Sequence, residues 1–460
     1  MVVFVVQFPL KPEVYQQDIL QKSFEAGRQL YNTLLTVTMK RYKEMVKTKL
    51  YRRSVKEVVE LTKQIANTKD RSKLKLLGTE KTRISKQLIS LREQYRISEY
   101  AFHSDMKGLR KHFEKNIDSH TAQKIASRLW GVYERLMYGS AEAVYYKKFG
   151  MMNSLEGKTN KQGIRFKDDY MYWGKLRIPV VIDRSNPYEA MALENNVKYC
   201  RLVQKRIREK YKHYLQIVFD GFAPPKIDKA TGEFKHHIGT SDVGLDIGTQ
   251  TVAISSESSV ELLELANRVQ NIENEKRRMQ RKIDRSRRAT NPDNYNADGT
   301  IKKQGSKKVA WTKSNRYLRL QGELQELQRK QAAIRKLQHE QLANIIIMLG
   351  DNVYVETMQF SGLQTRAKRT ERAESGRFKR KKRFGKSIAN KAPAMLLAIL
   401  DRKLKWHGKT LMKINTYETK ASQYNHVADS YEKKDLKERW NCIDGKRVQP
   451  KFPQELAHTA

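Results

Sequence analysis

The sequence predicts an α/β fold in which large helical insertions interrupt the sheets. Long stretches repeat apolar residues at spacings of three and four, the period of an amphipathic helix. Shorter stretches alternate apolar and polar residues, which is typical of strands with one buried face. The chain has 460 residues, enough to bury two or three cores. We therefore expect more than one domain.

The first half of the chain predicts a β-rich domain with a helical domain inserted into it. The apolar run at residues 2–6 predicts a strand, and helical spacing then starts at Leu20 and Phe24. Residues 16–144 are predicted to form the helical domain. Alternation around Ile178 and Ile217 predicts strands between residues 165 and 220. Residues 1–15 and 145–240 are thus expected to form a barrel-like β-domain, which the first strand joins and which ends in a linker.

The second half, residues 241–460, predicts a separate α/β domain. An alternating run predicts one strand from Val243 through Ile254, and another apolar segment ends at Glu356. Between them, helical patterns at residues 268–288 and 317–334 predict a helical hairpin within residues 268–349. A basic loop at residues 366–391, a helix around Leu400 and a strand at residues 410–417 follow. The chain from residue 420 onward is predicted to be irregular.

Net charge is the dominant physical property of the chain. The formal charge is +42, and self-repulsion on this scale favours binding to a polyanion. Nucleic acid is the leading partner and a membrane surface is the alternative. No stretch approaches the roughly 18 consecutive apolar residues of a membrane-spanning helix, so we expect no membrane partner. The only two cysteines, Cys200 and Cys442, lie far apart, which argues against a disulfide framework and a cysteine-rich zinc site.

Two carboxylates indicate chemistry. Asp246 lies in an apolar strand between Gly244 and Gly248, where an unpaired carboxylate is costly unless a cation or a donor meets it. If the strand ending at Glu356 lies beside it, the two acids form an oxygen-lined site for Mg²⁺ or Mn²⁺. Two-metal nuclease chemistry normally uses a third acid, and the sequence shows none. By itself an aspartate between glycines is more often a turn or capping residue. The order of strand, helical insertion, strand, basic loop and helix favours catalysis.

Basic segments outside this pair predict contacts with nucleic acid. On the helix at residues 268–288, Asp284 is the sole acid within the run of eight bases from Lys276 to Arg288, and a lack of acidic partners one turn away favours phosphate binding over an ordinary solvated face. In the loop, Phe378 and Phe384 are interleaved with six bases, although the whole tract is nearly as well explained by disorder. The predicted contacts are Lys205, Arg206, Arg208, Lys276, Arg277, Arg278, Arg281, Lys282, Arg285, Arg288, Arg377, Lys379, Arg380, Lys381, Lys382 and Arg383.

Three aromatic residues and two histidines have simpler explanations. Tyr170, Tyr172 and Trp173 could contact the end of a duplex, but packing into the β-domain is the better explanation. His236 and His237 lack carboxylate or cysteine neighbours at metal-ligand spacing, so we interpret them as ordinary linker residues.

Three segments resemble a known family. The runs GLDIGTQTVAIS and VYVETMQFSGL and the later Lys420-Ala421-Ser422-Gln423 resemble the RuvC-like domain of TnpB, the OrfB-type accessory protein of bacterial insertion sequences. The resemblance covers nearly the whole chain, and the TnpB family is itself related to type V CRISPR effectors. It implies a RuvC/RNase H-like domain, and an RNA-guided DNA endonuclease that uses magnesium, with a guide RNA and target DNA as partners. It also implies the bacterial cytoplasm, with association to the nucleoid when bound to DNA. Asp246 matches the first catalytic aspartate and Glu356 the catalytic glutamate.

Two departures from the family pattern change this expectation. The family's four-cysteine zinc ribbon would fall at residues 420–447, but Asn425 and Ala428 replace its first cysteine pair, so we expect no zinc. The third catalytic aspartate would follow residues 446–449, where residues 450–453 read Pro-Lys-Phe-Pro instead. Asp444 and Glu455 are weak substitutes. The C-terminus is therefore expected to be truncated or frame-shifted, and nuclease activity to be impaired.

Three other functions fit the same residues. The first is a nuclease-inactive, RNA-guided DNA-binding repressor. The second is an RNA-binding protein with no DNA role, and the third is a truncated relic that folds poorly. The oligomeric state is left open by the sequence.

Overall fold

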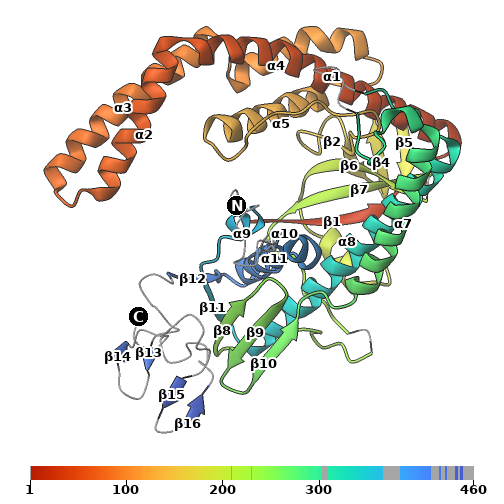
Figure 1. Cartoon of the computed structure of the whole chain (residues 1–460). Helices are drawn as coiled ribbons and strands as arrows, with labels where there is room; N and C mark the ends of the chain where they lie inside the picture. The colour runs from red at the N-terminus through yellow and green to blue at the C-terminus, as the bar shows by residue number, and fades with distance from the viewer. Residues whose placement is uncertain are drawn as a thin grey trace. The chain divides into compact units, whose positions relative to one another are not determined.

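The structure is a computed structural model with two compact units, Met1–Pro224 and Pro225–Ala460 (Figure 1). It describes residues 2–208, 210–228, 230–302, 309–365 and 384–415, together with the backbone of four short strands nearer the C-terminus. Those strands are β13 (Tyr424–Asn425), β14 (Ser430–Tyr431), β15 (Asn441–Ile443) and β16 (Lys446–Val448). The boundary between the units falls within the segment that the sequence predicts as a linker.

The helical part of the N-terminal unit contains α1 (Val14–Lys47), α2 (Lys49–Asn67), α3 (Arg71–Gln94), α4 (Glu99–Arg110), the short η1 (Lys111–Phe113) and α5 (Ser119–Met137). Capping explains where most of these helices begin. Thr48, Asp70, Ser98 and Asp118 precede α2, α3, α4 and α5, and each side chain accepts a hydrogen bond from a backbone N–H of the first turn. The helices follow the periodicity predicted for residues 16–144.

Seven strands of the N-terminal unit form two sheets. The first has the order β1 (Val3–Pro9), β7 (Lys210–Asp220), β6 (Val197–Ile207) and β2 (Ser154–Glu156). The second contains β3 (Arg165–Lys167), β4 (Tyr170–Trp173) and β5 (Leu176–Pro179), and the helix α6 (Pro187–Leu193) follows it. Strand β1 pairs antiparallel with β7, which confirms that the first strand joins this sheet. A single bridge between Leu10 and Val180 joins the sheets, and a closed barrel stays a prediction.

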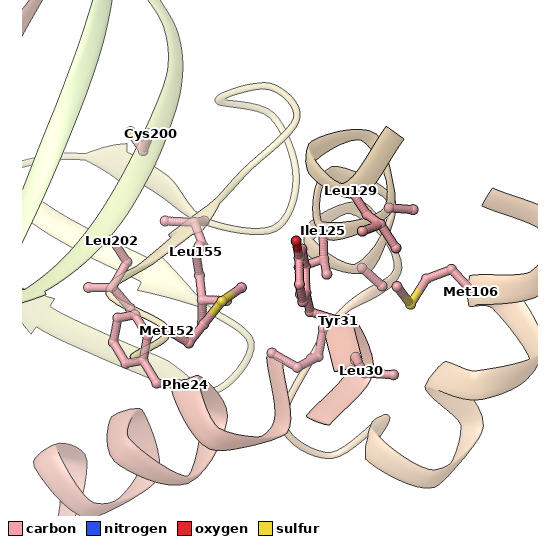
Figure 2. Packing of buried hydrophobic residues seen from close by; sticks show 14 of the residues in the cluster. Phe24, Leu30, Tyr31, Met106, Ile125, Leu129, Met152, Leu155, Cys200 and Leu202 are labelled. Carbon is pink, nitrogen blue, oxygen red and sulfur yellow. The ribbon is translucent and has the colours of Figure 1, made fainter. Parts of the chain in front are cut away.

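Helices and sheet of this unit share one hydrophobic core. Tyr31 of α1 stands between Ile125 of α5 and Leu155 of β2 (Figure 2). Leu202 of β6 belongs to the same buried cluster. Because the apolar face of α1 is completed by strand residues, the inserted helices and the β-domain are stabilised together.

The C-terminal unit is built on a five-stranded sheet of order β10 (Val260–Glu264), β9 (Thr251–Ser256), β8 (Asp242–Ile247), β11 (Asn352–Glu356) and β12 (Met412–Ile414). The prediction of one strand from Val243 through Ile254 is wrong. The chain turns at Gly248, whose N–H donates to the carbonyl of Thr251, and returns as β9 antiparallel to β8. The apolar alternation continues across the turn because Leu245 pairs with Ile254 and both face the same core.

Helices cover the apolar face of this sheet. α7 (Val269–Thr290) and α8 (Asn315–Leu349) form the predicted helical hairpin, with the short η2 (Pro292–Asn294) between them (Figure 1). α9 (Phe360–Gln364), α10 (Gly385–Lys391) and α11 (Pro393–Trp406) follow β11. The core joins Val243 and Leu245 of β8 and Val355 of β11 to Ile346 of α8 and Leu400 of α11. Residues 385–391, predicted as loop, are helical. Ile388 of this helix is 3% exposed and packs into the core, and the burial of its side chain stabilises the helix.

Candidate active site

Asp246 and Glu356 lie on neighbouring strands of the same sheet. Strands β8 and β11 are parallel, with Leu245 opposite Val355, so the next residue on each strand is one of the two acids. Adjacent strands lie about 4.8 Å apart, and side chains at the same register project from the same face. Leu245 and Val355 point into the core, so both carboxylates point to the opposite face.

Neither carboxylate has a neutralising partner. No hydrogen bond or ion pair to the side chain of Asp246 or Glu356 exists within the part of the chain that the structure describes. Burial raises the pKa of Asp246. Burial also raises the pKa of Glu356, and the negative charge of Asp246 adds to this effect. The fold therefore holds two acids together at a cost, which a cation between them would remove.

The donor set suits a hard divalent cation. Mg²⁺ and Mn²⁺ prefer oxygen ligands, and Mg²⁺ sites commonly use one or two protein carboxylates and fill the other positions with water and phosphate oxygens. Among the described residues, no group of three histidine, cysteine, aspartate or glutamate side chains is placed to hold a metal. Asp444 and Glu455, the weak substitutes for a third acid, and residues 450–453 lie outside the described residues.

Helix α10 is fixed beside the turn that follows Asp246. The Ser387 hydroxyl donates to the carbonyl of Thr249 at 3.1 Å. At the other end of α10, buried Lys391 forms an ion pair with Glu264 at 2.6 Å, and Arg335 donates to the carbonyl of Ala389 at 2.7 Å. Sequence reasoning missed this role and counted Lys391 with the basic tract. The last residues of the tract are therefore fixed against the turn that follows Asp246.

The basic helix α7 has more acidic partners than the sequence predicts. Glu273 pairs with Lys276 and Arg277, and Asp284 pairs with Arg287 and Arg288. The predicted lack of partners one turn away is therefore wrong for these four bases: Glu273, which precedes the basic run, pairs with two of them, and Asp284 alone pairs with the other two. Lys276 also donates to Gln331 of α8, which commits it to packing within the hairpin.

The other four bases of α7 remain candidates for phosphate contacts. They are exposed, and the ion pairs of the described residues do not include them; they are Arg278, Arg281, Lys282 and Arg285. Because nothing in the described chain neutralises these side chains, their charge is available to a polyanion.

The β6–β7 hairpin of the N-terminal unit carries the second predicted basic surface. Lys205, Arg206 and Arg208 are exposed near its tip. Lys205 lies opposite Lys212 in the ladder, an arrangement that costs free energy without an anion nearby. Its ammonium group contacts the Tyr214 ring and donates to the Gln7 side chain, so Lys205 also packs against its own sheet.

The remaining predicted positions follow their simpler explanations or lie outside the described residues. Trp173 is buried and donates to Asp118, as expected for core packing. Tyr170 and Tyr172 are half-buried under arginine side chains. His236 contacts Asn344. The predicted contacts Arg377, Lys379, Arg380, Lys381, Lys382 and Arg383 lie outside the described residues, as do the side chains of residues 420–447.

Comparisons with known proteins leave the chain without an assigned family. No protein-family model matches it, and no curated protein matches it. None of the described helices combines the length and the apolar character that spanning a bilayer requires.

Proposed function

We propose that this protein is a TnpB-like, RNA-guided DNA-binding protein of an insertion sequence whose RuvC-like nuclease site is impaired. One observation carries the proposal: Asp246 and Glu356 occupy equivalent positions on adjacent parallel strands, on one face, and no side chain or backbone group of the described residues donates to either carboxylate. The resemblance assigns its two catalytic acids to these same positions. The charge of +42 supports a nucleic-acid partner.

The chain's own residues would do two things at this site. Asp246 and Glu356 would hold Mg²⁺ or Mn²⁺ against a phosphate of the target strand, and the exposed bases of α7 would bind backbone phosphates. When bound, the metal would supply Lewis-acid activation of water and stabilise the leaving oxygen. With two acids in place of three, the site is expected to hold fewer metal ions, or to hold them less well, which would lower the rate of hydrolysis.

A nuclease-inactive, RNA-guided DNA-binding protein is the second candidate. The observation that favours it is that the described residues include no third acid beside the pair. In this case base pairing with a guide RNA would supply sequence specificity, and the protein would recognise the shape of the duplex and its backbone.

Cleavage and retention of a matched DNA separate these candidates. The protein is purified with the RNA that accompanies it, that RNA is sequenced, and complementary and mismatched duplexes are offered with Mg²⁺. We expect DNA retention that depends on complementarity, and cleavage that is weak or absent. Asp246→Ala is expected to abolish any residual cleavage while retention persists. Robust cleavage that Asp246→Ala removes would contradict the impairment, and retention that ignores complementarity would contradict the guided mode.

A further inference from the structure

Residues 144–151, here called the aromatic segment, connect α5 to β2 and are held in place by backbone contacts. The Lys147 N–H donates to the Asn32 side chain at 2.8 Å, and the Lys147 carbonyl accepts from Asn32 at 2.9 Å and from Arg28 at 3.0 Å. Both partners lie on α1. The segment is therefore fixed at its centre although it contains no helix or strand.

This anchored segment presents large rings to solvent. Tyr145 is 76% exposed and Phe149 is 74% exposed, and neither ring stacks on another aromatic ring or a cation among the described residues. Tyr146 is 55% exposed, and its hydroxyl lies 3.3 Å from that of Thr36. Exposed rings on a fixed backbone lose little conformational entropy when a flat partner stacks on them.

A cationic cavity lies between the two elements that the aromatic segment joins. It has a volume of about 260 Å³ and lies between α5 and β2, where Lys124 and Arg128 face Ser154 and Glu156. Ile125 of α5 and Leu155 of β2, which belong to the buried cluster in Figure 2, supply the apolar part of its lining. A water molecule occupies about 30 Å³ of liquid, so the cavity has room for a hydrated phosphate group.

Positive charge is in excess around this cavity. Glu156 pairs with Lys124 at 3.0 Å and with Arg201 at 2.7 Å. Arg128 donates both to the carbonyl and to the hydroxyl of Ser154, and within the described chain it forms no ion pair with a carboxylate. Burial lowers the pKa of Arg128, and burial together with the charge of Arg128 lowers the pKa of Lys147. Lys124 and Arg201 thus share one carboxylate, whereas the ion pairs of the described residues include neither Arg128 nor Lys147; an anion in the cavity would relieve the repulsion between Lys124 and Arg128.

We propose that the cavity and the aromatic segment together bind single-stranded nucleic acid, with a backbone phosphate in the cavity beside Lys124 and Arg128 and bases stacked on Tyr145 and Phe149. The combination of a cationic recess with exposed rings matches the general mode of single-strand recognition, in which stacking tolerates any base. The inference rests on nucleic acid being the partner in the proposed function, but it does not involve Asp246 or Glu356.

Binding of one oligonucleotide sequence, as single-stranded RNA, single-stranded DNA and duplex DNA, tests this site. The full chain is used in EDTA, so that cleavage cannot contribute. Stacking on an aromatic ring commonly changes affinity about tenfold, so the double variant Tyr145→Ala with Phe149→Ala is expected to bind the single strands about a hundredfold more weakly. Duplex binding is expected to change less than threefold, because its bases are not available for stacking. The RNA and DNA strands show which of the two the site prefers.

Matched variants separate the site from a general loss of structure. Tyr100→Ala removes an equally exposed ring of the same unit, 84% exposed on α4, and is expected to leave affinity unchanged. The double variant Tyr145→Phe with Phe149→Tyr keeps both rings and is expected to bind single strands with wild-type affinity. Lys124→Gln is expected to weaken binding and to reduce the slope of log affinity against log salt by about 0.7, the value for one phosphate contact on a single strand.

Each contrary result has a defined meaning. If the wild-type chain binds no nucleic acid, this inference and the proposed function fail together. If it binds and the ring substitutions change nothing, or change duplex binding equally, only this inference fails. If anionic phospholipid vesicles bind the chain and lose affinity with the same substitutions while oligonucleotides do not, the surface recognises membrane and the inference is overturned.

Discussion

Replacing Gly350 with alanine is expected to unfold the C-terminal unit or to destabilise it by about 3 kcal/mol or more, beyond ordinary overpacking. A Cβ at this position would overlap the Ser241 carbonyl and would lie 2.9 Å from Cγ2 of Val243. Ser241 immediately precedes β8 and Val243 belongs to it, so relief of the overlap requires strand β8 to move away from the chain entering β11. The same movement would separate Asp246 from Glu356.

Urea unfolding and the circular dichroism of the variant test this expectation. Gly362→Ala is the matched control in the same unit, because a Cβ there meets nothing within 4 Å and the position is helical. It is expected to be neutral or slightly stabilising. If Gly350→Ala is as stable as the wild type, this result would contradict the close approach between the backbone that precedes β8 and the backbone that precedes β11.

Lowering the pH from 7 to 5 is expected to destabilise the N-terminal unit by about 2 kcal/mol through His213 alone. His213 is 4% exposed, and burial lowers its pKa from 6.5 to about 4. The folded unit therefore favours the neutral ring, whereas the unfolded chain takes up a proton near pH 6.5. The stabilisation is complete above pH 6.5 and is lost as the pH falls from there toward 4. Across the ladder His213 faces Gln204, which offers no charge to compensate a protonated ring.

The difference between wild type and His213→Gln isolates this contribution. Urea unfolding of the full chain is measured at pH 7 and at pH 5. Hydrogen exchange of the β6–β7 amides at the same two pH values reports on the stability of this unit. The variant is expected to lose most of the pH dependence. His112→Gln, an exposed histidine of the same unit, is expected to keep it. Equal pH dependence in wild type and His213→Gln would show that His213 is not held in its neutral form.

Patterns of side-chain burial explain why much of the fold could be predicted. The strands at residues 3–9, 210–220 and 352–356 alternate clearly, and the helices at residues 14–47 and 315–349 keep a helical period over many turns. The turn at Gly248 was missed because both strands of the hairpin present their apolar residues to one core. Helix α10 was missed because seven residues are too few to show a period beside so many bases.

The candidate site was only partly visible in the sequence for similar reasons. Asp246 stood out because a carboxylate in an apolar strand has no packing role, and Glu356 because it ends the next such segment. Their adjacency depends on the parallel pairing of β8 with β11, which no local pattern encodes. The cations near Glu156 come from three separate segments of chain, α5, the aromatic segment and β6, and their grouping could not be predicted at all. Tyr145 and Phe149 did leave a signal, since lysines separate them, but the exposure of their rings is a property of the fold.

Binding of Mn²⁺ to the full chain, measured by titration with and without substitutions of the acid pair, tests the central claim most directly. The wild-type protein is expected to bind Mn²⁺ at a site that either Asp246→Asn or Glu356→Gln removes. Asp242→Asn, on the same face of the same strand, is expected to leave binding intact. In EDTA, Asp246→Asn is expected to raise the unfolding temperature, because the fold raises the pKa of this carboxyl and so disfavours its charge. Mn²⁺ binding that survives both substitutions, or that Asp242→Asn removes equally, would contradict a cation site formed by Asp246 and Glu356.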